Sequence, residues 1–114
     1  MAGVTQEDKY GNTNLAVWNL TSADPDGDKI TRPGASDRAV QVAGTFGGAT
    51  VVIQGSLNDG ATWDTLHDPG GVAITFTSKG INAISENVTN IRAILSPVGS
   101  GANVNVYLLS RSTR

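Results

Sequence analysis

Residues 38–57 read RAVQVAGTFGGATVVIQGSL, and this stretch decides the fold class. On both sides of Gly47-Gly48, apolar residues alternate with polar or small ones. Strict alternation of this kind is typical of half-buried strands. Two alternating runs joined by Gly-Gly favour a β-hairpin, so we expect paired strands over 38–45 and 49–57.

Similar alternation recurs along the rest of the chain, with turn signals between the runs. We expect further strands at 14–21, 62–66, 72–76, 81–85, 91–95 and 103–109, and a short fragment at 29–31. No segment has a convincing helical period, so we expect almost no helix. Eight or nine short strands spaced by turns predict an all-β chain, either an antiparallel β-sandwich or a barrel.

The apolar members of the alternating runs predict the core. We expect the following side chains to be buried: Val17, Val40, Val42, Val51, Ile53, Leu66, Ile74, Phe76, Ile91, Ile94, Val104, Val106 and Leu108. In the first run, Leu15, Val17 and Leu20 suggest one face and Trp18 the other. This alternation predicts that Trp18 packs at the sheet surface or in a subunit contact.

Length and composition limit what the chain can do. With 114 residues it is long enough for one domain, and we assign 14–114 to a single β-sandwich and the polar, aperiodic residues 1–13 to an N-terminal arm. The net charge of −2 argues against a nucleic-acid surface. There is no Cys and one His, which excludes thiolate chemistry and paired imidazoles. We find no signal peptide and no apolar run long enough for a membrane helix.

Two groups of residues have side chains that could carry chemistry. Asp24, Asp26 and Asp28 alternate as in the start of a calcium loop, but the glycine is misplaced, so a solvated turn is the better interpretation. His67 has Ser and Asp residues nearby in sequence, but no nucleophile-elbow motif accompanies it. We therefore expect no enzymatic activity, no metal and no cofactor.

The most specific local motif is SLNDGATW, residues 56–63. It is similar to the Asp-box, a hairpin motif, with Asn58 where Asp usually stands. In such a hairpin the polar side chains satisfy turn N–H groups, and Gly60 takes a positive φ at the tip. This assigns Ser56, Asn58, Asp59, Gly60 and Trp63 a structural role. The alternative is that Trp63, with Trp18 or Tyr107, stacks on a sugar ring.

From Arg38 onward the chain resembles small structural proteins of tailed bacteriophages. The resemblance rests on residues 39–51, on Gln54-Gly55-Ser56 with the following Asp-Gly and Trp63, on ITFT at 74–77, and on NIR at 90–92. It is greatest for the jelly-roll head decoration, or cement, proteins, and it implies an all-β, jelly-roll-like antiparallel β-sandwich of eight to nine short strands.

That resemblance implies a virion structural protein that binds the outer surface of the head and clamps neighbouring major capsid subunits. It would be synthesised in the host cytoplasm, with no nucleic-acid or membrane partner. Other interpretations are a phage tail or neck component, or a carbohydrate-binding β-sandwich. Open edge strands and a symmetric shell also predict a homo-oligomer, with a trimer favoured and a dimer possible.

We expect docking to use the arm, residues 1–13, and the irregular loop 22–37, because long irregular segments in compact domains are often functional. The candidate contact residues are Glu7, Asp8, Lys9, Tyr10, Trp18, Lys29 and Arg32. Because no predicted core residue lies in the arm, removal of residues 2–11 is expected to leave the domain folded and to weaken capsid binding.

Overall fold

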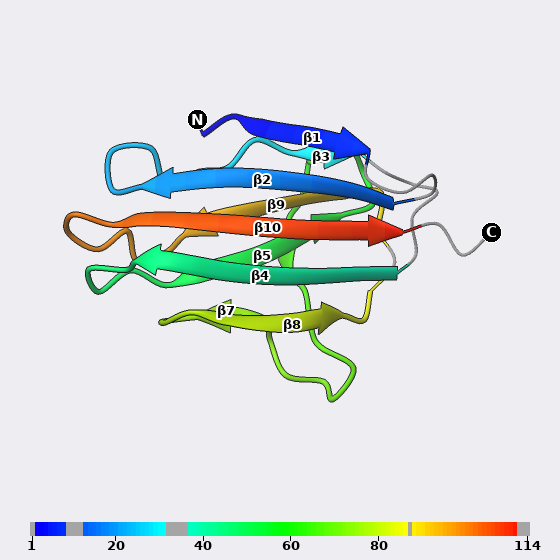
Figure 1. Ribbon diagram of the computed structural model, residues 1–114. Helices are drawn as coiled ribbons and strands as arrows, with labels where there is room; N and C mark the ends of the chain where they lie inside the picture. The colour runs from blue at the N-terminus through cyan, green and yellow to red at the C-terminus, as the bar shows by residue number, and fades with distance from the viewer. Residues whose placement is uncertain (1, 9–12, 32–36, 87, 112–114) are drawn as a thin grey trace.

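The computed structural model describes residues 2–8, 13–31, 37–86 and 88–111, and these form ten antiparallel strands and no helix (Figure 1). The strands are β1 (Val4–Asp8), β2 (Thr13–Thr21), β3 (Ile30–Thr31), β4 (Asp37–Thr45), β5 (Val51–Ser56), β6 (Asp64–Thr65), β7 (Thr75–Phe76), β8 (Gly80–Ile84), β9 (Asn90–Leu95) and β10 (Asn103–Arg111). Within these ranges no helix is long and apolar enough to cross a membrane.

Two sheets face each other in this β-sandwich. The first has the order β1-β2-β10-β4-β8 and the second the order β3-β9-β5-β6, with β7 also paired to β5. From β2 onward, the chain alternates between the sheets except over β5, β6 and β7, which all lie in the second sheet. The resulting strand order, with two interleaved Greek keys, is that of a jelly roll. The predicted fold class is therefore confirmed, with β1 as an additional edge strand.

The core between the sheets contains most of the predicted residues. Every side chain predicted to be buried is buried, except for Val17 and Ile94. These two are partly exposed on the solvent side of their sheets. In β2 the inward residues are instead Ala16, Trp18 and Leu20, so the expected orientation of this strand was reversed. Both faces of β2 are apolar, and alternation alone does not show which face is buried.

The Gly47-Gly48 turn does not close a hairpin. β4 pairs with β10 and β8, whereas β5 pairs with β9, β6 and β7, so this turn carries the chain from one sheet to the other. Both glycines have positive φ, and a side chain on Gly47 would collide with the carbonyl of Ser100. A tight Gly-Gly turn therefore serves a sheet-to-sheet connection as well as a hairpin.

The described part of the N-terminal segment lies along the domain. Val4–Asp8 forms β1, which pairs with β2, and Ala2 is buried, with backbone hydrogen bonds of 2.7 Å to Asp26 and Asp28. The sequence of β1 is almost entirely polar because most of an edge strand faces solvent. The premise that no core residue lies in residues 2–11 is wrong, because Ala2 is buried in the core and Val4–Asp8 forms a paired strand.

Candidate binding surface

A row of apolar side chains covers the solvent side of the first sheet. Tyr107 of β10 lies beside Val17 of β2, and Leu109 lies beside Leu15. Ile81 of β8 continues this surface beyond β4. We call these five residues the outer face. Because β10 is the central strand, residues nearly 100 positions apart in sequence meet here (Figure 1).

The outer face is unusually accessible for apolar side chains. Ile81 is 69% exposed and Leu109 is 42% exposed. A shallow pocket of about 230 Å³ lies among Leu15, Ile81, Tyr107 and Leu109. Exposed apolar clusters on soluble proteins often mark surfaces that bind another protein.

Polar groups flank the outer face at both ends. On one side, Asn19 Nδ2 donates to Asn103 Oδ1 at 2.8 Å and to Asn105 Oδ1 at 2.9 Å. On the other side, Arg111 forms an exposed ion pair with Asp37 at 2.9 Å. An apolar centre with a polar rim is the usual anatomy of a protein–protein interface.

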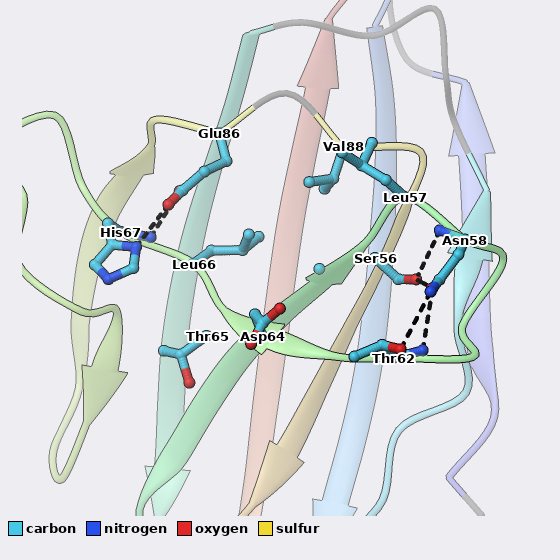
Figure 2. A pocket seen from close by; sticks show the side chains of 11 residues that line it. Ser56, Leu57, Asn58, Thr62, Asp64, Thr65, Leu66, His67, Glu86 and Val88 are labelled. Atoms are coloured by element: carbon cyan, nitrogen blue, oxygen red, sulfur yellow. Dashed lines mark hydrogen bonds and ion pairs between the residues drawn. The ribbon is translucent and has the colours of Figure 1, made fainter.

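The hairpin between β5 and β6 has the predicted Asp-box-like geometry (Figure 2). Ser56 Oγ donates to Asn58 Oδ1 at 2.7 Å and accepts from the N–H of Gly60 at 2.9 Å, while Asn58 Oδ1 accepts from the N–H of Thr62 at 3.0 Å. Asp59 and Gly60 have φ values of 59° and 87°, as in a type I′ turn. The positive φ predicted for Gly60 and the predicted side-chain hydrogen bonds to turn N–H groups are confirmed.

Trp63 lies on the solvent side of the second sheet and is partly covered there. The Arg92 guanidinium lies 4.5 Å from the centre of its ring, and Arg92 Nε donates to Gln54 Oε1 at 2.8 Å. Beside Trp63, Lys29 Nζ donates to the carbonyl and carboxylate of Asp59 at 2.8 and 3.1 Å. A pocket of about 310 Å³ lies between these side chains.

His67 and Glu86 link the two sheets at the side of the sandwich (Figure 2). Glu86 accepts hydrogen bonds from the backbone N–H of His67 at 2.7 Å and pairs with His67 Nδ1 at 2.6 Å. Desolvation raises the pKa of Glu86, but these hydrogen bonds outweigh it, so the pKa lies below its usual value. His67 therefore contacts a glutamate rather than the Ser and Asp residues near it in sequence.

The structure separates the predicted contact residues. Glu7 and Asp8 are exposed on β1, and Lys29 is exposed beside the hairpin tip. Lys9, Tyr10 and Arg32 lie outside the described residues. Trp18 is 1% exposed, and its Nε1 donates to the carbonyl of Asp28 at 2.7 Å, so its assignment as a surface contact is wrong.

The backbone groups of the three aspartates in the 24–28 segment form hydrogen bonds that hold the chain in place. The carbonyl of Asp26 and the N–H of Asp28 pair with the backbone of Ala2, and the N–H of Asp24 donates to Thr21. Among the described residues, no group of three or more His, Cys, Asp or Glu side chains is arranged to hold a metal ion.

Comparison with known proteins supports the fold. No protein-family model and no curated protein matches the sequence. The SPBc2 prophage-derived protein YomS superposes with a TM-score of 0.59 at 9% identity, covering 86% of this chain and 95% of that one. A recombinant oxalate oxidase in complex with glycolate superposes with a TM-score of 0.52 at 13% identity, covering 99% of this chain and 52% of that one. At these identities the likeness shows the fold alone.

Proposed function

We propose that this chain is a phage virion structural protein without enzymatic activity, and specifically a decoration protein on the outside of the head. Its partner is then the major capsid protein. The observation that carries the proposal is the outer face, an accessible apolar surface with a polar rim on a rigid sheet. The resemblance of residues 38–92 to phage structural proteins and the fold likeness to a prophage-derived protein support it.

In this proposal Tyr107 and Leu109 supply the central contact area on the coat subunits. Aromatic side chains at the centre of an interface contribute much of its binding energy. The exposed Asn and Arg–Asp groups at the rim fix the orientation. Weak individual contacts suffice, because a lattice of identical sites presents many copies at high local concentration.

Co-sedimentation with empty heads, assembled from the major capsid protein of the same phage, tests the proposal. The intact chain is expected to sediment with the heads. Leu109→Asp is expected to stay in the supernatant, because it places a charge in the outer face. Val72→Asp is the matched control, since Val72 is 64% exposed in the loop between β6 and β7.

Failure of the intact chain to bind heads, or equal binding by Leu109→Asp, would contradict the proposal. Binding to purified tails rather than heads would instead support the tail or neck alternative.

Carbohydrate binding is the second candidate, favoured by the polar pocket beside Trp63. Its donors and acceptors come from Lys29, Asp59 and Arg92, next to an aromatic ring. Against it, Arg92 already covers the Trp63 ring, and Trp18 is buried. Glycan-array binding that is lost in Trp63→Ala and kept in Leu109→Asp would favour this function over head decoration.

A further inference from the structure

The free edge of β8 is the least protected strand edge of the first sheet. Within the described residues β8 forms a ladder only with β4, on one side. Ser85 donates its N–H to the carbonyl of His67 at 2.8 Å, away from β4. Because backbone groups alternate along a strand, the N–H and C=O groups of Ile81 and Ala83 also face away from β4.

The opposite edge of the same sheet, formed by β1, is protected against pairing with a further strand. β1 has the sequence VTQED and ends with two carboxylates, Glu7 and Asp8. Charges on an edge strand discourage pairing with a second strand. β8 has the sequence GINAI, without a charged residue or a proline, and its Ile81 is 69% exposed. A five-residue, uncharged edge with an exposed isoleucine is a template for strand addition.

We propose that β8 pairs antiparallel with β8 of a second copy of this chain, which joins two five-stranded sheets into one. An identical strand pairs with itself antiparallel only about a two-fold axis. The register that pairs all five residues is centred on Asn82. Ile81 then exchanges backbone hydrogen bonds with Ala83 of the partner subunit, and the two Asn82 residues form a non-hydrogen-bonded pair.

This pairing also joins the two outer faces. Ile81 and Ala83 point to the same side of the sheet as Tyr107, so the apolar surface continues across the two-fold axis. The contact is isologous and closes at two copies. It therefore gives a dimer rather than the trimer expected from shell symmetry. The inference is independent of head binding, because the dimer forms in solution without a capsid.

Single-cysteine variants provide a direct test, because the chain has no cysteine of its own. In the proposed register the Asn82 Cα atoms lie about 4.5 Å apart, as in non-hydrogen-bonded strand pairs. That separation is within the range that a disulfide spans. Asn82→Cys is expected to form a disulfide-linked dimer on mild oxidation, whereas Gln6→Cys, on the opposite edge, is expected to remain mainly monomeric.

Light scattering of the unmodified chain is expected to give twice the monomer mass. Ile81→Lys is expected to give the monomer mass, since it adds a charge to an exposed edge position. Its melting temperature is expected to match that of the unmodified chain at dilutions where that chain is also monomeric. Leu57→Lys is the control, because Leu57 is 72% exposed elsewhere and its substitution is expected to leave the dimer intact.

A monomer mass at concentrations up to about 1 mM, where even an association with a Kd of about 1 mM is detected, would overturn the proposal. A trimer mass, or equal cross-linking of the two cysteine variants, would overturn it as well.

Discussion

The two solvent-facing sides of the sandwich differ in how far their side chains are paired with one another. On the first sheet, Tyr107, Leu109 and Ile81 present apolar surface to solvent. On the second sheet, the polar groups of Arg92 and Gln54 pair with each other and Trp63 lies against the guanidinium. The polar side chains of the second sheet pair with one another, whereas the first sheet leaves apolar side chains exposed to solvent. This difference is the reason for placing the proposed binding surface on the first sheet.

The largest expected effect separates the two tryptophans. Trp18→Ala removes a fully buried side chain from the first sheet and is expected to cost about 3–5 kcal/mol of unfolding free energy. Trp63→Ala loses partial burial and the contact with Arg92, and is expected to cost about 1 kcal/mol. Urea unfolding measures both.

Should Trp18→Ala not fold, Trp18→Phe provides the comparison, because it keeps most of the volume and removes the hydrogen bond to Asp28. Equal losses at Trp18 and Trp63 would contradict the placement of Trp18 in the core and of Trp63 on the solvent side of the second sheet.

The next effect is at the hairpin of the second sheet. Gly60→Val is expected to cost about 1 kcal/mol or more, because a β-branched residue is strained at a φ of 87°. The new Cβ would also lie 3.1 Å from the Trp63 ring. Gly3→Val is the control, since nothing lies within 4 Å of a Cβ there. A melting temperature for Gly60→Val that matches the control would contradict the strained turn.

A smaller effect compares two arginines. Arg92→Ala removes the contact with Trp63 and leaves Gln54 without its donor, so we expect a loss of about 1 kcal/mol. Arg111→Ala breaks an exposed ion pair at the rim of the outer face and is expected to cost less than about 0.5 kcal/mol. A larger loss of melting temperature in Arg111→Ala than in Arg92→Ala would contradict this difference between the two sheets.

The smallest expected effect concerns Glu86, which ties the two sheets together through His67. Because the folded-state pKa of Glu86 is lowered, its carboxylate stabilises the fold above the unfolded-state value, and this contribution is lost as the pH falls through the folded-state pKa. Glu86→Gln is expected to lower the melting temperature slightly at neutral pH. The difference from the unmodified chain should start to shrink near pH of about 4.3 and vanish below it. A difference that persists unchanged in acid would contradict this account.

The sequence predicts most of the inward residues where only one face of a strand is strongly apolar. In β4 and β10, Val40, Val42 and Val104 alternate with polar or small residues, and all three are buried. In β2, Leu15 and Val17 are at least as apolar as Ala16 and Trp18, so alternation leaves the buried face undetermined. β1 escapes prediction because a polar edge strand has no periodic apolar signal.

The hairpin and the outer face also differ in how far the sequence predicts them. The hairpin at 56–63 is predictable, because its hydrogen bonds connect residues within eight positions of one another. The outer face is not, because it exists only when β2, β10, β4 and β8 are paired in their observed order. Leu109 and Ile81 gave no separate signal, since exposed apolar residues look like core residues in sequence.

The central position of β10 has a kinetic consequence. This strand follows the other nine in the chain, yet it separates β2 from β4 and pairs with both over its full length. The first sheet therefore forms only after about 80 intervening residues have been synthesised and closed into a loop. Topologies with such distant pairings fold in milliseconds to seconds rather than microseconds. Until β10 is in place, β2 and β4 are both open edges, and a nascent chain at this stage is most exposed to aggregation.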